Sequence, residues 1–170
     1  MSVNNADIYK YLKTVWDGSD LDTLFQALWK SGSSTSEFTV LCDQEAPAKQ
    51  PFPYCVMDPI SPLTTDSMSG SGNSIREIRD ITIMFNVFAR DVSGDSRSSK
   101  EIAAYLAEEI MKIFGGHPTE NPSDLTTSTT LDNGNMLIIQ CERDYGLHAG
   151  SDEYQWLLEY TFKADVPVAI

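Results

Sequence analysis

The clearest pattern in the chain is an alternating stretch followed by a helical one, within residues 74–115. Apolar side chains occupy every second position at Ile81, Ile83, Phe85, Val87 and Ala89, and most positions between them are polar. This two-residue period predicts a half-buried antiparallel strand with one solvated face. Ser98 and Glu101 then form a capping-box pair, and apolar residues follow at helical spacing until Gly115. We expect this helix to lie on the sheet.

Two helical segments are expected before the first strand. In residues 1–18 apolar side chains share one helical face and Gly18 ends the pattern, which fits either a short helix or a docking arm. A second helix is predicted from Ser19, whose hydroxyl would cap its first turn, to about Lys30. Its buried stripe would consist of Leu21, Leu24, Phe25 and Leu28.

The remaining chain is predicted to form strands joined by long connections. The expected strands are residues 38–42, 54–57, 136–143 and 153–166, of which the last two would form a hairpin. Pro, Ser, Thr and Gly are typical of loops, and they dominate the three expected connections. These are a long mobile loop over residues 58–74, an irregular stretch over 115–135 with a turn signal at 132–134, and the hairpin loop 144–152, where Gly146 and Gly150 would be flexible.

Length and composition favour one compact domain. A chain of 170 residues with 41% hydrophobic content can bury a core without staples. The sequence therefore predicts an α+β fold, a mainly antiparallel sheet with helices packed on one face. Residues 19–170 would form the domain and residues 1–18 the arm or short helix. The three cysteines, Cys42, Cys55 and Cys141, have no paired spacing and are expected to be buried free thiols, as in a reducing cytoplasm.

The charge of the chain bears on its partners. The formal net charge is −13 and the sequence pI is about 4.3, which disfavours direct binding of nucleic acid. An acidic surface either keeps a protein soluble or lines a passage through which DNA slides without sticking. No apolar run is long enough to span a bilayer, and residues 1–10 lack the apolar core of a signal peptide. We expect neither membrane insertion nor export by that route.

Catalytic and metal-binding patterns are weak. The two histidines, His117 and His148, are not in a metal-binding spacing, and HxxxH, HExxH and CxxC are absent. A nucleophile pair of Cys141 and His148 is conceivable, but a shared hairpin explains their closeness in sequence. The glycines Gly70 and Gly72 are not followed by the Lys and Ser or Thr of a phosphate-binding loop. The sequence predicts no enzyme, no cofactor and no metal.

Four segments carry a resemblance to a known group of proteins. They are residues 21–28 (LDTLFQAL), 51–57 (PFPYCVM), 81–90 (ITIMFNVFAR) and 102–110 (IAAYLAEEI). In this order the chain resembles the small tail-completion and tail-terminator proteins of long-tailed bacteriophages, including a family described as a tail-component domain of unknown function. The likeness covers roughly residues 19–165 and consists of hydrophobic patterns and turn placement.

The resemblance implies a structural protein of the virion. It implies a ring, commonly a hexamer, that caps the tail tube and joins the tail to the head connector. The expected partners are other copies of this chain, the tail tube protein and a connector or neck protein. The protein would be assembled in the host cytoplasm, and DNA would pass through the lumen without specific binding. The alternatives are a neck or stopper adaptor, and a cytoplasmic ligand-binding domain or enzyme.

If the chain forms such a ring, the loop 58–74 and the hairpin tip 145–152 are expected to be its assembly surfaces. Exposed strand edges and long loops are the parts of such a subunit that reach neighbouring molecules. The candidate interface residues are Asp58, Thr64, Asp66, Met68, Asn73, Arg76, Arg90, Asp91, Asp95, Tyr145, His148 and Asp152.

Overall fold

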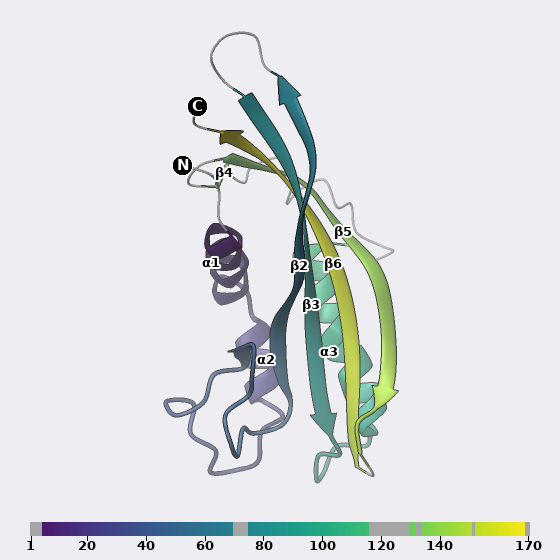
Figure 1. Ribbon diagram of the computed structural model, residues 1–170. Coiled ribbons are helices and arrows are strands. Elements are labelled where there is room, and N and C mark those ends of the chain that lie inside the picture. The colour runs from purple at the N-terminus through teal and green to yellow at the C-terminus, as the bar shows by residue number, and fades with distance from the viewer. Residues whose placement is uncertain (1–4, 70–74, 116–129, 132–133, 151, 169–170) are drawn as a thin grey trace.

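The computed structural model describes residues 5–69, 75–115, 130–131, 134–150 and 152–168. The elements are α1 (Asn5–Asp17), α2 (Leu21–Gln26), β1 (Leu41–Asp43), β2 (Tyr54–Ser69), β3 (Ile75–Arg90), α3 (Ser99–Phe114), β4 (Thr130–Leu131), β5 (Gly134–His148) and β6 (Glu153–Val168). The described strands form one sheet in the order β1-β2-β3-β6-β5-β4, as Figure 1 shows. All neighbouring pairs are antiparallel except β1 and β2. The predicted α+β class is confirmed.

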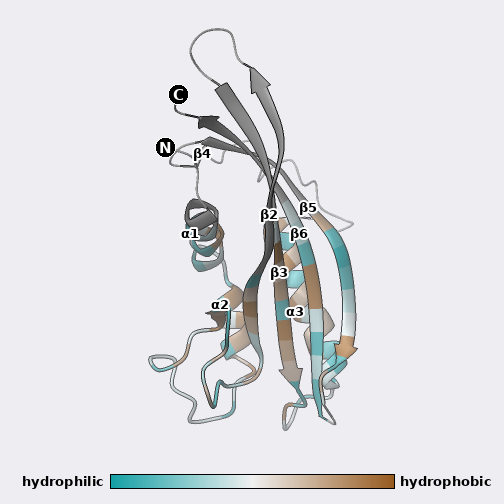
Figure 2. Ribbon diagram, viewed as in Figure 1, coloured by the Kyte–Doolittle hydropathy of each residue, from teal (hydrophilic) through white to brown (hydrophobic). Residues whose placement is uncertain are grey.

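The helices pack on one face of the sheet, as predicted. The alternating residues Ile83, Phe85, Val87 and Ala89 of β3 are fully buried. They share one hydrophobic core with apolar residues of all three described helices and of β2 and β6. Figure 2 shows the apolar colouring along the lower part of β3 and on α3. Because a strand points alternate side chains to opposite faces, the residues between them lie on the other face, on which none of the described helices packs.

Aromatic rings join the elements of this core. Phe85 of β3 lies with its ring centroid 6.2 Å from Trp16 of α1, 5.0 Å from Phe114 of α3 and 5.8 Å from Tyr160 of β6. Aromatic pairs at these separations add to the free energy of burial. The Tyr160 hydroxyl donates to the carbonyl of Gly115 at 2.5 Å, which satisfies one carbonyl at the end of α3.

The start of α3 confirms the predicted cap. Ser98 is the N-cap, its hydroxyl oxygen accepts from the Glu101 N–H, and the Glu101 carboxylate accepts from the Ser98 N–H at 2.8 Å. Both halves of the capping box are therefore formed. Gly115 follows the last helical residue with a φ of 91°, a conformation that favours glycine.

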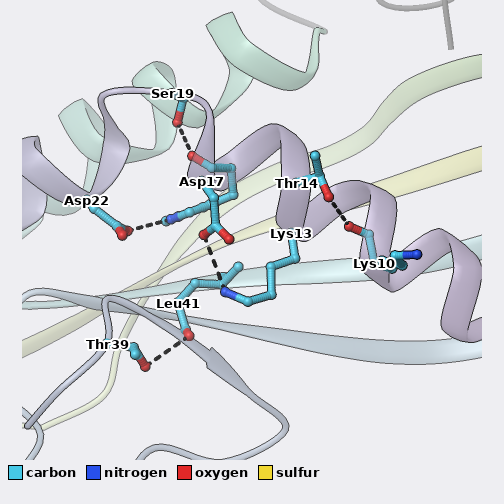
Figure 3. A network of polar contacts seen from close by, with 9 residues as sticks. Lys10, Lys13, Thr14, Asp17, Ser19, Asp22, Thr39 and Leu41 are labelled. Carbon is cyan, nitrogen blue, oxygen red and sulfur yellow. Dashed lines mark hydrogen bonds and ion pairs between the residues drawn. The ribbon is translucent and has the colours of Figure 1, made fainter.

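The corner between α1 and α2 is held by polar contacts (Figure 3). Residues 1–18 do contain a helix, which is α1. The second helix is shorter than predicted and has only six residues, with Asp20 rather than Ser19 at its N-cap. The Ser19 hydroxyl instead donates to the Trp16 carbonyl at 2.6 Å, and the Trp16 indole N–H donates to Asp22 at 2.7 Å. The Ser19 oxygen also accepts the N–H of Leu21, the first residue of α2, at 3.3 Å, so the hydroxyl contacts the first turn as predicted although Asp20 takes the N-cap position.

The loop predicted over residues 58–74 was also wrong over most of its length. β2 continues to Ser69 and pairs with β3 throughout, while residues 70–74 lie outside the described part of the chain. Two register shifts, between Pro59 and Ser61 and between Thr64 and Asp66, interrupt this pairing. Beyond Met57, β2 has only β3 beside it among the described strands, and an edge strand tolerates proline. The paired ends of β2 and β3 form the extension at the top of Figure 1.

The hairpin of β5 and β6 is confirmed but longer than predicted. β5 continues through residues 144–148, which were expected to be loop, and His148 pairs with Tyr154. Gly146 is therefore a strand residue opposite Trp156, where the Tyr154 and Trp156 rings cover it. The first predicted strand also moves, because β1 begins at Leu41. Of the connection predicted over 115–135, residues 116–129 and 132–133 lie outside the described residues, and with them most of the turn signal at 132–134, whereas Thr130 and Leu131 form β4 and pair antiparallel with the start of β5.

We expect Gly146→Ala to destabilise the protein. A Cβ added at Gly146 would lie 2.5 Å from Cε1 of Tyr154 and 2.8 Å from Cε3 of Trp156, so both rings must move. Overpacking of this kind costs about 1–3 kcal/mol in the free energy of unfolding. Urea denaturation measures the difference. Gly150→Ala is the matched control, because its nearest neighbour would be 3.7 Å away. Equal stability of the two variants would contradict this account of Gly146.

Candidate functional site

The candidate site is the sheet face opposite the helices, which we call the helix-free face. The register places one set of side chains on it from four adjacent strands. These residues are Tyr54, Val56 and Asp58 of β2, Met84, Asn86 and Phe88 of β3, Gln155 and Leu157 of β6, and Tyr145 and Leu147 of β5. Most of them line a hollow of about 530 Å³ together with residues 44–46.

The centre of the helix-free face is less solvated than the sequence predicts. Asn86 was expected on a wet face, yet only 7% of its surface is exposed. Its side-chain carbonyl accepts a hydrogen bond from Gln155 Nε2 at 3.0 Å. Val56 and Leu157 flank this pair and are also buried. The long neighbouring side chains on the same face therefore shield an amide pair set in apolar surroundings.

Two exposed apolar residues extend this face toward the edge of the sheet. Tyr145 is 39% exposed and Leu147 is 47% exposed, which is unusual for large apolar side chains. In the strand register, Tyr145 is paired with Leu157 and Leu147 is paired with Gln155. Both residues therefore extend the apolar part of the helix-free face onto β5, and we call them, together with Val56 and Leu157, the apolar strip. Tyr145 is among the interface residues predicted from the sequence, and Leu147 is not. Residues 144–152 were expected to form a loop, so no strand pattern indicated that the two side chains share a face.

Ion pairs lie along the rim of the face. Arg90 donates to Glu153 through Nε at 3.0 Å and also through a terminal nitrogen, and this hydrogen bonding raises the pKa of Arg90. The Arg90 guanidinium also lies 4.1 Å from the centroid of the Phe52 ring. Arg143 lies 3.5 Å from Glu159. Most charged side chains on the rim are therefore paired with a side chain of opposite charge. Asp58 is exposed there and adds negative charge.

The structure brings only some of the predicted interface residues together. Asp58, Tyr145 and Arg90 lie on the helix-free face or its end, and Asp152 lies in the turn beside Arg90. Thr64, Asp66 and Met68 are positions in β2, Arg76 is the β3 residue opposite Met68, and Asn73 lies outside the described residues.

Three of the predicted residues have local contacts instead. Asp91 accepts the N–H of Ser99 at 2.7 Å, at the start of α3. Asp95 is bonded to Arg97, which lowers the Asp95 pKa to about 2. His148 has the opposite strand parity to Tyr145, and its ring centroid lies 4.9 Å from that of Tyr154.

The conceivable nucleophile pair of Cys141 and His148, which the sequence analysis set aside, is also excluded by geometry. Cys141 and His148 are both in β5, seven residues apart, which corresponds to about 23 Å along a strand. Cys42 and Cys55 are buried free thiols as predicted, whereas Cys141 is only partly buried. Across the part of the chain that the structure describes, no group of three His, Cys, Asp or Glu side chains is arranged to hold a metal ion.

The fold is an α+β sheet whose described helices all pack on one face. A comparison of the chain with protein-family models and with curated proteins finds no match. Among the described helices, none has the length and apolar character needed to cross a bilayer.

Replacing one member of the amide pair should destabilise the protein more than replacing both. Gln155→Leu leaves the buried carbonyl of Asn86 without a donor, which costs about 1–3 kcal/mol in the free energy of unfolding. The double variant Asn86→Leu with Gln155→Leu removes both polar groups, and we expect it to recover most of that loss. Chemical denaturation of the wild type, both single variants and the double variant provides the cycle. Additive losses would contradict a coupled pair.

The Cys141 thiol should react slowly at neutral pH. Burial, followed by the charge of Asp144, raises its pKa to about 11, so the thiolate is scarce below that pH. We expect the rate of iodoacetamide labelling at Cys141 to rise about tenfold per pH unit between pH 7 and 9.5. Peptide mass spectrometry resolves this site from Cys42 and Cys55. A rate that levels off near pH 9 would show an ordinary thiol.

Proposed function

We propose that the protein is a structural subunit of the tail-terminator or head-tail joining type, which assembles into a closed ring at the end of a phage tail tube. The observation that carries this proposal is the helix-free face with its exposed apolar residues Tyr145 and Leu147. An apolar strip on a sheet face that no helix of the described chain covers is typical of a surface buried by another molecule. The sequence resemblance supplies the identity of that assembly.

The sheet edges favour contact through the face rather than strand addition. The outer part of β2 holds Pro59 and Pro62 and two register shifts. At the opposite edge, β5 has a register shift between Cys141 and Arg143 and a charged run at residues 142–144. Prolines, bulges and charges are the features by which natural sheets resist edge-to-edge pairing. A heterologous contact that uses the helix-free face can close into a ring.

The negative charge fits a passage for DNA. With a net charge of −13, copies arranged in a ring would present many carboxylates to the lumen, which repel DNA phosphates and reduce sticking. On this proposal the partners are further copies of the chain, the tail tube protein and a connector or neck protein, and the place of action is the virion. The protein acts without catalysis or a cofactor. A neutral or basic lumen in the assembled ring would contradict this use of the charge.

The oligomeric state tests the proposal directly. We expect the purified protein to form a multi-subunit species across a concentration series in light scattering and native mass spectrometry, with a central hole in negative-stain images. Leu147→Asp places a charge in the apolar strip at an already exposed position, so the fold should be retained. We expect the subunit dissociation constant to rise at least about tenfold, because a buried unpaired charge opposes association.

Ser96→Asp is the matched control, since it adds the same charge at an exposed position in the turn after β3. It should leave the oligomer unchanged. Co-purification with tube protein or with connector protein then separates a terminator from a neck or stopper adaptor. A strict monomer at all concentrations, including in the presence of tube protein, would contradict the proposal that the chain assembles into a ring.

A further inference from the structure

The sheet continues beyond the helices at one end. There residues 75–81 of β3 pair with residues 162–168 of β6 in an unbroken antiparallel register. Figure 1 shows these strand ends rising above α1, α2 and α3. We call residues 75–81 and 162–168 the sheet extension. Each of its two strand segments spans about 20 Å.

Alternate positions in the sheet extension keep the apolar pattern of the core. The fully buried pair Ile83 and Tyr160 marks the core side of the sheet. Outward from Tyr160, every second position of β6 is apolar, and these positions are Phe162, Ala164, Val166 and Val168. Opposite them in the register, β3 has Ile81, Arg79, Glu77 and Ile75. Because alternate strand positions lie on opposite faces, the extension has one largely apolar face, on the same side of the sheet as the helices.

This apolar face of the extension carries no net charge on β3 and β6. Its charged positions are Glu77 and Arg79, which have opposite signs, whereas the whole chain has a net charge of −13. Copies of such an acidic chain repel one another, and the repulsion is smallest where the contacting surfaces are neutral. The apolar strip on the helix-free face also consists of uncharged residues. Two surfaces of the chain therefore suit contact with another copy.

The chain has few apolar residues left with which to cover the extension itself. The longest segment outside the described residues is 116–129, with the sequence GHPTENPSDLTTST. Leu125 is its one large apolar residue. A segment of this composition is poorly suited to exclude water from an apolar sheet face. Apolar faces of this kind are typically covered by another molecule.

The two surfaces lie on opposite sides of the sheet and at different positions along its strands. The apolar strip is in the rows of Asn86 and Phe88, whereas the extension begins beyond the row of Ile83. A contact that joins two different surfaces of identical copies is heterologous, so it repeats in one direction and can close into a ring. A copy that carries both surfaces can contact one neighbour through each of them.

We propose that the apolar face of the sheet extension in one copy packs on the apolar strip of the next copy. The inference rests on the proposed ring, whose subunit contact it assigns to one named surface from each neighbour. Ala164 and Val166 of one copy lie against Tyr145 and Leu147 of the other. Two sheet faces packed in this way lie about 10 Å apart, with their side chains interdigitated.

Single lysine substitutions separate the two surfaces. Leu147→Lys changes the strip, and Val166→Lys changes the extension at a position where Glu77 lies opposite in the register and can pair with the new lysine. Each lysine makes the chain less acidic, so general repulsion between copies does not explain a loss of association. We expect either variant to raise the subunit dissociation constant at least about tenfold. Ser96→Lys, at an exposed position in the turn after β3, is the matched control and should assemble like the wild type.

An equimolar mixture of Leu147→Lys and Val166→Lys tests the pairing of the two surfaces. The first variant keeps an intact extension and the second an intact strip, so one contact forms between them and no further subunit is added. Sedimentation velocity up to about 0.5 mM should show a two-chain species that neither variant forms alone. A purification tag on one variant should retain the other. Absence of this species, or pairs of one variant only, would overturn the proposal.

The wild type distinguishes failure of this contact from failure of the ring. A ring formed by both the wild type and Val166→Lys would leave the ring standing and show that the assigned contact is wrong. The same ring with lost retention of tube protein would place the extension against the tube and would also overturn the proposal. A monomeric wild type would contradict the ring itself.

Thermal unfolding followed by circular dichroism checks that the extension variant is folded. Val168→Lys, opposite Ile75 in the last row of the extension, replaces Val166→Lys if the latter lacks a cooperative transition. The same outcomes then decide the proposal.

Discussion

The structure depends on the burial of Phe85 between elements that are distant in sequence. Its ring contacts Trp16 of α1, Phe114 of α3 and Tyr160 of β6, and it is fully buried. Because these contacts all lie on one side of β3, they draw the helices to the same face of the sheet. The hydrophobic effect is the main favourable contribution to folding, so this one-sided core accounts for the architecture.

The same one-sided burial has a consequence for function. Where helices cover only one face of a sheet, the side chains of the other face contact one another, solvent or another molecule. Here the centre of that face carries the bonded pair Asn86 and Gln155, which suits either environment. Tyr145 and Leu147 at its side remain exposed. This combination of a satisfied centre and an apolar margin is the physical basis for proposing that another subunit lies there.

The predictions that were correct rest on local signals. The capping box and the helical spacing located α3, and the alternation of β3 identified the buried parity from Ile83 onward. Those that were wrong needed information from a partner strand. Residues 58–69 and 144–148 have loop-like composition, but pairing with β3 and β6 makes them strands. Gly146 was expected to be flexible, yet the rings of Tyr154 and Trp156 require a residue without a side chain there.

The sequence by itself determined the fold class, the cap and length of α3, the core face of β3 and the acidic charge, because periodicity and capping act between residues close in the chain. Only the tertiary structure decided that Leu147 continues an apolar strip, and that Gln50 lies in a cavity with Lys30 and Lys49. These relations join residues whose separation in sequence has no fixed period. Strand register and chain packing alone bring them together.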